Sequence, residues 1–510
     1  MKNKVSGLLS ALCLFGAIPA LSQSQLDALR YSRTDGGATA RTLSMAGAFG
    51  ALGGDLSVMA LNPGALGVYG SSEWVMTMGK ASSHSKLNVD NFGYVGTSPT
   101  GSQTGVLSWT TGFAYQRVKD FRRQYSYSLS PGQSISDYIA VRGEGYDLED
   151  LDDPNAYDNG VDWLPALGYQ AGLIDYFGQE ADPRSAFGDV NLEGRYVPYN
   201  LSHASLQVEE QGKTERYLLG AAINIDDRLY AGFSLAILDL DYSYSSTYDE
   251  KFTNDDDLFL DNSLITKGTG FGLSVGFVGR PTDYLRLGVA YRSPVWYTMT
   301  DYFYAAAGSS VTIGEDFRLG KAQSPDGAFF EYSFRSPPQW LFSAAAICSQ
   351  YGLISLDYEV TDYGDMGLFE RHGETILAAN RGIKANMGRT GTVRIGGEWK
   401  VSQHLALRAG WSYSEPAVQG MLGSGFTDME GVVAGTIPHF TIDKGTRRYS
   451  VGIGYRLTTN LYADAAWLWA SHKEKAYPFP QLDYEPGQPI GGTTLVTHRR
   501  QLAFTVGYKF

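Results

Sequence analysis

The last eleven residues of the chain, RQLAFTVGYKF, alternate between large apolar side chains and small or polar ones. One face of an extended strand would carry Leu502, Phe504, Val506, Tyr508 and Phe510, whereas Gln, Ala, Thr, Gly and Lys alternate with them. A transmembrane β-strand needs about 9–11 residues, which alternate between facing lipid and facing the lumen. This stretch therefore predicts a strand of a membrane β-barrel.

The same pattern recurs along the chain, as in FGLSVGFV (271–278), LRLGVAYR (285–292) and YSVGIGYRL (449–457). The second face of these runs holds glycine, alanine, serine and charged residues such as Arg286 and Arg456. Charges are costly in a dry core without partners. A barrel with lipid outside and a polar lumen inside accepts them, so the pattern favours a barrel over a soluble sandwich.

The number of alternating runs predicts an all-β fold, a transmembrane antiparallel barrel of about 14 strands. Short polar turns at 226–227, 281–283, 402–403 and 458–460 join neighbouring runs and would face the periplasm. The expected strands are 72–80, 86–97, 104–119, 203–224, 228–248, 267–280, 283–305, 328–347, 352–361, 391–401, 404–415, 446–457, 460–473 and 498–510. The expected extracellular loops are 130–199, 309–326, 361–389, 416–444 and 477–497.

Two strands contain irregular features. In LYAGFSLAILDLDYSY the apolar residues change parity, which predicts a β-bulge near Ala236 and Ile237. Pro337 and Pro338 predict an interrupted ladder or a strand start. Seven tryptophans near strand ends are interpreted as interfacial girdles: Trp74, Trp296, Trp340, Trp399, Trp411, Trp467 and Trp469.

The first 22 residues have the features of a secretory signal peptide: a lysine-containing start, an apolar stretch and the small-residue motif Ala20-Leu21-Ser22. Aromatic residues make up 13% of the whole chain. Beyond residue 22 the sequence has no run of about 18 apolar residues, which is the length that a membrane helix requires. An exported, aromatic- and glycine-rich chain of this kind points to the bacterial outer membrane.

The net charge of −13 argues against nucleic acid as a partner. Acidic loops such as 146–160 explain much of this charge, and a calcium site in them stays open.

Residues 46–69, AGAFGALGGDLSVMALNPGALGVY, do not alternate. Asp55 is expected to cap a short helix that Asn62 and Pro63 end. This small-residue run, followed by about 14 strands and a terminal Phe, resembles the FadL/TodX family of outer-membrane transporters of hydrophobic compounds. The resemblance implies a hatch inside the barrel, so we divide the chain into a signal peptide (1–22), a hatch (23–71) and a barrel (72–510).

By the same resemblance, Asp55, Asn62, Pro63 and Gly64 belong to the gating segment, although the family usually has alanine where Gly64 stands. The expected function is passive uptake of small hydrophobic compounds, such as long-chain fatty acids, across the outer membrane, whose lipid is an expected partner. The terminal strand resembles the signal read by the barrel-assembly machinery, which we assign to Phe504, Val506, Tyr508 and Phe510. A carboxylate head group would need basic partners. The lumen-side candidates are Arg286, Arg292, Arg394, Arg408 and Arg456. Each of them could instead form a lumen ion pair with one of the inward-facing carboxylates Asp357, Glu359, Glu398 and Asp464.

A second hypothesis is a secretion or surface-assembly component that holds a secretion-system protein with its long acidic loop. A barrel enzyme is disfavoured because no Ser/His/Asp or paired-acid arrangement can be assembled from the sequence. The seven histidines show no metal-ligand spacing, so no metal or other cofactor is expected, while haem binding stays open.

Overall fold

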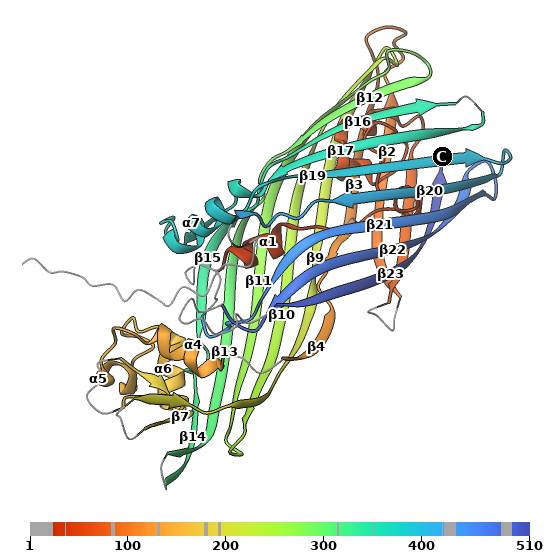
Figure 1. Cartoon of the computed structure of the whole chain (residues 1–510). Helices are drawn as coiled ribbons and strands as arrows, with labels where there is room; N and C mark the ends of the chain where they lie inside the picture. The colour runs from red at the N-terminus through yellow and green to blue at the C-terminus, as the bar shows by residue number, and fades with distance from the viewer. Residues whose placement is uncertain are drawn as a thin grey trace, which may run out of the picture.

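The computed structural model describes residues 24–35, 37–82, 87–129, 133–177, 182–191, 195–313, 316–348, 350–420, 422, 435–480 and 492–510. The expected signal peptide lies outside these residues. Figure 1 shows a long barrel with the helices of residues 135–170 and 377–386 near one end. No helix in the described part of the chain has the length and apolar character to cross a membrane.

The strands close into an antiparallel barrel because β1 (Glu73–Ala81) pairs with β2 (Asn88–Pro99) on one side and with β23 (Thr493–Lys509) on the other. Its other uninterrupted strands are β3 (Val106–Asp120), β9 (Leu201–Ile225), β10 (Leu229–Phe252), β11 (Asp257–Gly279), β17 (Gly352–Asp362), β19 (Arg389–Lys400), β20 (Leu405–Ser414), β21 (Phe440–Arg456) and β22 (Leu461–Tyr477). A short strand, β4 (Arg123–Leu129), continues β3 along β9. Together with two interrupted strands, this confirms the predicted 14-strand barrel.

The two interrupted strands lie side by side. β12 (Leu285–Arg292) continues as β13 (Trp296–Ile313), and β15 (Phe329–Arg335) continues as β16 (Gln339–Ile347). The interruption at Pro337 and Pro338 was predicted, whereas the one at Pro294 was not. Ser336 links the two interruptions, because its N–H donates to the Val295 carbonyl at 3.0 Å and its hydroxyl accepts the Val295 N–H at 2.8 Å.

The prediction of a loop at 309–326 is wrong. Residues 309–326 continue β13 and then return as β14 (Asp316–Gln323) in a hairpin. Its sequence is polar, and the alternation is weak because both faces of β14 are largely exposed. The four predicted turns all fall between consecutive strands. Asp226 and Asp227 both have φ near +53°, as the tight hairpin turn between β9 and β10 requires.

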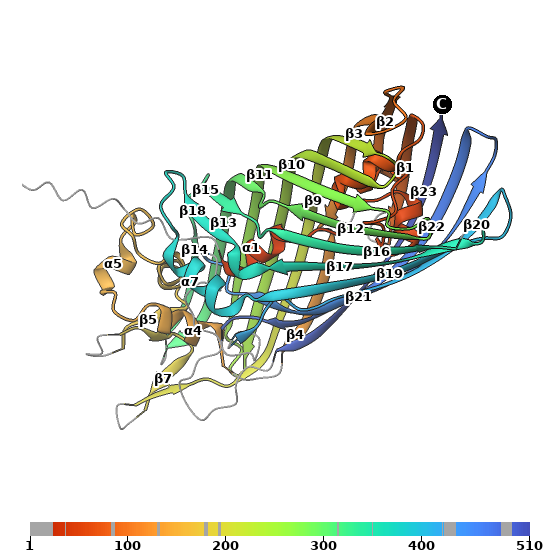
Figure 2. The same ribbon diagram turned by 90° about the horizontal axis from the view of Figure 1, so that it is seen from above.

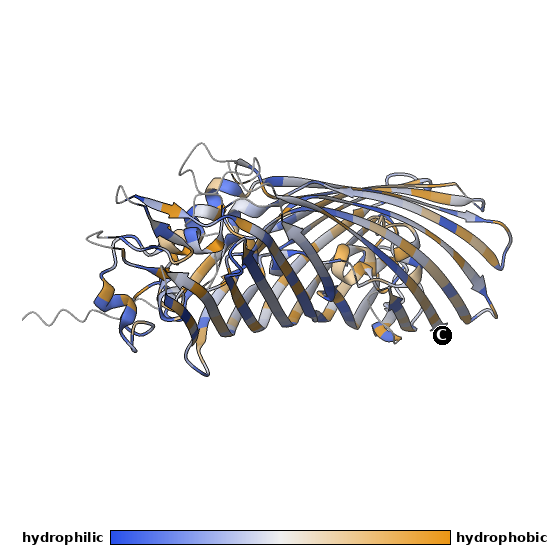
Figure 3. Cartoon of the chain, turned by 60° about the horizontal axis from the view of Figure 1, so that its bottom comes forward, coloured by the Kyte–Doolittle hydropathy of each residue, from blue (hydrophilic) through white to orange (hydrophobic). Residues whose placement is uncertain are grey.

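An apolar belt surrounds the end of the barrel that carries these short turns. On β10 the outward side chains are apolar from Leu229 to Ile237, and the next outward residues are Asp239 and Asp241. Their neighbours on β11 at the same height are Thr269 and Lys267. Hydrophobic and hydrophilic residues alternate along the strands in Figure 3. The belt is therefore the surface that a membrane-spanning barrel presents to lipid.

Beyond the belt the pattern inverts without any change in the backbone. The inward residues Leu240, Tyr242, Tyr244 and Tyr248 are buried, while the outward ones are polar. The predicted bulge near Ala236 and Ile237 is wrong, because β10 keeps an unbroken register with β9 and β11 from Leu229 to Lys251. The apolar parity changes because the strand leaves the belt, so that the outer face meets water and the inner face meets a packed core.

The described residues of the expected acidic loop 130–199 form a folded unit. It contains α4 (Ile135–Arg142), α5 (Leu148–Asp152), α6 (Trp163–Gln170) and the short pairs β5 (Ile174–Asp175) with β6 (Arg184–Ser185) and β7 (Gly188–Val190) with β8 (Tyr196–Pro198). We call this unit the cap domain. It holds 14 acidic and three basic residues, and thus a net charge of −11 out of −13. A second cluster at the same end comprises η2 (Tyr363–Asp365), β18 (Gly367–Glu370) and α7 (Leu377–Asn386).

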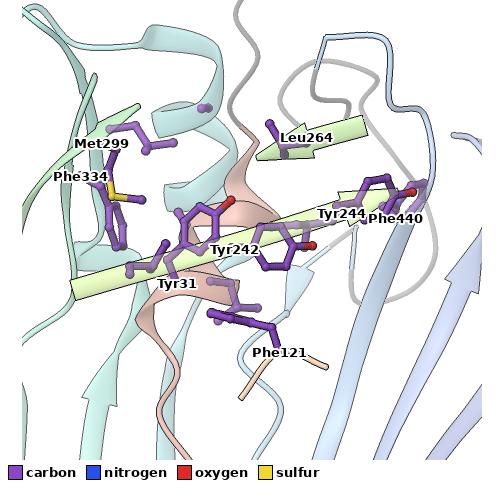
Figure 4. Packing of buried hydrophobic residues seen from close by; sticks show 14 of the residues in the cluster. Tyr31, Phe121, Tyr242, Tyr244, Leu264, Met299, Phe334 and Phe440 are labelled. Atoms are coloured by element: carbon purple, nitrogen blue, oxygen red, sulfur yellow. The ribbon is translucent and has the colours of Figure 1, made fainter. Parts of the chain in front are cut away.

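The N-terminal segment, residues 24–71, lies inside the ring of strands (Figure 2). It forms α1 (Gln25–Ser32), α2 (Ala40–Ser44), α3 (Val58–Leu61) and the 3-10 helix η1 (Pro63–Val68). Tyr31 of α1 packs beside Tyr242 of β10, with ring centroids 5.7 Å apart, in the apolar half of the lumen (Figure 4). The N-terminal segment thus extends from the apolar core near the long loops to the part of the lumen inside the belt, where the wall residues are small.

Candidate functional site

The predicted gating residues lie where the N-terminal segment touches the wall. The Asn62 side-chain amide donates to the Gly50 carbonyl at 2.7 Å and to the Phe277 carbonyl of β11 at 3.1 Å, and its oxygen accepts the Gly64 N–H at 3.1 Å. A Cβ at Gly64 would lie 2.5 Å from the Gly276 carbonyl oxygen. Glycines on the inner faces of the wall strands therefore allow backbone to approach backbone at Asn62-Pro63-Gly64.

Asp55 has a different role from the one expected. The N-cap of α3 is Ser57, and Asp55 accepts the Ser57 N–H at 2.9 Å and the Thr39 hydroxyl at 2.6 Å. The predicted N-cap is therefore displaced by two residues, while the predicted end of the helix before Asn62-Pro63 is confirmed. Asp55 joins α2 to α3 within the segment.

Asp357, which was expected to face the lumen as an ion-pair partner of the arginines, instead holds the glycine-rich stretch. Asp357 on the inner face of β17 accepts the N–H groups of Phe49 at 3.0 Å and Gly50 at 2.9 Å. Its side chain is fully buried. Removing this carboxylate would leave two backbone donors without an acceptor.

The five predicted arginines fall into three groups. Arg408 pairs with Glu398 at 2.7 Å and with Asp464 at 2.6 Å, and Glu398 also receives Arg41 of the N-terminal segment at 3.1 Å. The guanidinium of Arg286 donates to the Leu52 carbonyl. These two arginines therefore hold the N-terminal segment against the wall.

The second group, Arg292 and Arg394, shares the carboxylate of Glu359, with Arg394 at 3.0 Å. Arg456 forms the third group alone, since it lies exposed at the end of β21, next to a short turn. Only Arg292 and Arg394 of the five line the large cavity described next.

A cavity of about 510 Å³ lies in the lumen between the N-terminal segment and the wall. Its lining contains ten cationic side chains (Arg30, Arg33, Lys119, Arg122, Arg123, Arg216, Arg292, Arg394, Arg448 and Arg499) and seven carboxylates (Asp35, Asp120, Glu210, Glu359, Glu415, Asp443 and Glu474). Apolar residues of α1, α2 and α3, among them Leu29, Leu43 and Leu61, complete it. A strongly acidic protein thus encloses a cavity with an excess of positive charge.

Arg216 of β9 is one of the cavity residues that were not predicted from the sequence. Its guanidinium donates to the Gln116 side chain at 2.7 Å, and it makes no ion pair with any described residue. Within the described chain, the Nε atoms of Arg216 and Arg292 and the Nη1 atom of Arg394 are buried without an acceptor. Arg216 shares the inward parity of Leu218 and Ala222, so that alternation along β9 could have identified it. We call Arg216, Arg292 and Arg394 the arginine cluster.

No group of three or more metal-ligating side chains is found among the described residues. Cys348, a free cysteine, lies exposed in the turn between β16 and β17.

The geometry defines a class: a closed 14-strand barrel whose N-terminal segment lies inside the lumen against a charged cavity. No protein-family model and no curated protein sequence matches the chain. Among solved structures, a Pseudomonas aeruginosa FadL homologue superposes with a TM-score of 0.53 at 12% identity, covering 94% of this chain and 99% of that one. The chain therefore has the fold of the FadL/TodX family, which is the family that its sequence resembles.

Two further structures show lower similarity. The CymD monoaromatic hydrocarbon channel is 11% identical over 93% of this chain and 98% of its own, with a TM-score of 0.47. The toluene transporter TodX of P. putida is 12% identical over 92% and 98%, with a TM-score of 0.46.

Proposed function

We propose that the protein is a bacterial outer-membrane channel for passive uptake of small hydrophobic compounds that carry an anionic head group, with long-chain fatty acids as the leading candidates. The N-terminal segment would act as the hatch of this channel. The observation that carries the proposal is the arginine cluster, which places three guanidinium groups and one carboxylate on a lumen cavity. The apolar belt and the FadL-type fold support the membrane location and the transport role.

The chemistry of the cavity matches an amphiphile. Guanidinium groups bind carboxylates and phosphates through charge-assisted hydrogen bonds. Leucine and alanine side chains of α1 to α3 offer apolar surface for the tail beside these charges. A neutral hydrocarbon would leave the buried guanidinium donors without an acceptor, so the cavity favours an anionic ligand.

Ligand recovery tests the proposal. The barrel would be purified in mild detergent from its own membrane, and its bound lipids would be identified by native mass spectrometry. We expect an anionic amphiphile in the wild type and its loss in Arg394→Ala and Arg216→Ala. Arg389→Ala is the matched control, because Arg389 lies on the same strand as Arg394 but is exposed outside the cavity. A barrel that carries no small molecule, or one whose ligand survives all three changes, contradicts the proposal.

The hatch role has its own test. Deleting residues 45–66 removes the part of the N-terminal segment that fills the belt region. We expect a large increase in single-channel conductance in planar bilayers, since these residues pack against the inner faces of β10 and β11 at the height of the belt. An unchanged conductance would refute gating by this segment.

A second candidate function is a secretion or surface-assembly role, and the folded cap domain favours it. A domain with a net charge of −11 suits a basic protein partner. Recovery of the barrel with a stoichiometric protein that is lost when the cap domain is deleted would support this role over uptake.

A further inference from the structure

The link between α1 and α2 runs along the inner face of β3 beside the cavity. The Asp35 N–H donates to the Val118 carbonyl at 2.7 Å. Gly37 adopts φ of +87°, and a Cβ there would lie 2.7 Å from the Arg117 carbonyl oxygen. At Asp35 and Gly37 the link therefore lies close against the wall, and its described residues belong to no helix or strand.

The Asp35 carboxylate lies among three cations from three different wall strands. Arg499 of β23 approaches it at 2.7 Å, and Lys119 of β3 and Arg448 of β21 approach it at 3.5 Å. Burial acts to raise the pKa of Asp35, but Lys119, Arg499 and Arg448 outweigh it and hold the pKa well below its usual range. The carboxylate is therefore ionised at physiological pH.

This group of charges faces the cavity that would take a ligand. Asp35, Lys119, Arg448 and Arg499 all line it, and the Asp35 side chain keeps 32% of its surface exposed there. The wall contributes the cations, whereas the N-terminal segment contributes the carboxylate. A carboxylate from elsewhere could satisfy the same three cations.

We propose that Lys119, Arg448 and Arg499 form an anion-binding site that Asp35 occupies in the resting protein, and that the anionic head group of an amphiphile competes with Asp35 for it. The inference rests on the proposed uptake of amphiphiles. The ligand class is a single-chain amphiphile with a carboxylate, sulfate or phosphate head. Its binding would free the link between α1 and α2 from the wall and thereby couple ligand charge to the position of the hatch.

Charge explains why a neutral ligand would not act in the same way. Arg499 also pairs with Asp120 at 3.4 Å, whereas Lys119 and Arg448 pair with no other carboxylate among the described residues. Displacing Asp35 without supplying another anion leaves these two partly buried cations without their counter-charge, which is strongly unfavourable. An alcohol of the same chain length should therefore bind without moving the link. Comparing an alcohol with a carboxylate of the same chain length therefore isolates the effect of the charged head group.

The test compares dodecanoate with dodecanol at pH 7.5, measured by isothermal titration calorimetry on the mature barrel in a non-ionic detergent. If Asp35 occupies the site about 90% of the time, Asp35→Asn should tighten dodecanoate binding about tenfold and leave dodecanol binding unchanged. Arg499→Gln added to Asp35→Asn should cancel the gain. Asp239→Asn is the control, because Asp239 is a carboxylate on the outer face of β10 that does not line the cavity.

The outcomes separate this inference from the proposed function. Unchanged dodecanoate affinity in Asp35→Asn, or equal tightening of both probes, overturns the competition while leaving uptake intact. Failure of the wild type to bind either probe contradicts the proposed function instead.

A second measurement does not depend on the folding of Asp35→Asn. Thr34→Cys, placed in a Cys348→Ser background, reports on the link through its rate of reaction with a charged thiol reagent. We expect dodecanoate to accelerate labelling and dodecanol to leave it unchanged. Equal rates with the two probes would overturn the proposal.

Discussion

Single residues decide how closely the N-terminal segment approaches the wall. The stretch from Asn62 to Gly64 was predicted as important from its sequence, and the structure shows the close backbone contacts that its small residues permit. The partners of other lumen residues were harder to predict. Alternation places Asp357 on the lumen side, but Asp357, Arg216 and Asp35 all bond to residues more than 80 positions away in the sequence, and no local pattern encodes such pairs.

Gly64→Ala tests the close approach. The added methyl group would meet the Gly276 carbonyl, a backbone atom that cannot move aside, so we expect a destabilisation of about 1–3 kcal/mol in the docking of the segment. The measurement is single-channel conductance, which should show frequent openings. Gly70→Ala is the control, because a Cβ there meets nothing within 4 Å. Equal conductance in both variants would show that the contact is unimportant.

At the scale of the elements, alternation predicted the number of strands but not where each strand ends. Reading a strand from its alternation assumes that lipid surrounds the barrel, and this assumption holds only within the belt. Along β10 the polarity inverts at Asp239, and the expected bulge was a misinterpretation of this inversion. The folded cap domain was also missed, because its short helices alternate with many acidic residues that are typical of loops.

Docking of the cap domain depends on one buried carboxylate. Glu250 of β10 accepts the Ile135 N–H at the start of α4 at 2.8 Å, the Tyr248 hydroxyl at 2.7 Å and the Ser134 hydroxyl. Glu250→Ala leaves these donors without an acceptor, at about 1–3 kcal/mol each. We expect faster amide exchange and easier proteolysis in residues 133–177. Asp249→Ala, next along the strand on its opposite face, should behave as wild type, and matching behaviour of the two variants would contradict this role.

The cap domain should also respond to pH. Burial raises the pKa of Asp137 to about 6, although the Ser134 N–H that it accepts acts in the opposite direction. Since the unfolded value is about 3.9, the folded domain retains a proton that the unfolded chain releases. Its stability should therefore fall as the pH rises from about 4 through 6, by up to about 3 kcal/mol.

Amide exchange of α4 between pH 4 and 7, corrected for intrinsic rates, measures this dependence. Asp137→Asn should make it shallower, whereas the titration of Glu250 at the start of α4 and the general repulsion within the acidic domain remain in both proteins. An identical slope in the variant would assign the pH response to Glu250 and that repulsion.

At the scale of the whole molecule, the belt covers only the short-turn end of a much longer barrel. The outward face of β10 is apolar over Leu229–Ile237, and the strand then continues to Phe252 with polar residues outside. The protein would therefore project well beyond the membrane and carry most of its negative charge at that far end. This position was not predictable from strand counting, because the alternation alone does not say which of the two faces meets lipid.

Two arginine substitutions on the outer face of β10 test this placement. Phe233 is 52% exposed in the middle of the belt, whereas Ser243 points outward on the same strand beyond it. An arginine at the bilayer midplane costs about 2–4 kcal/mol and near zero to 1 kcal/mol at the interface. We expect Phe233→Arg to lose this amount in urea unfolding from lipid vesicles and Ser243→Arg to match the wild type. Equal losses at the two positions would mean that the membrane extends further along the barrel, and that the apolar lumen above Asp239 lies within it.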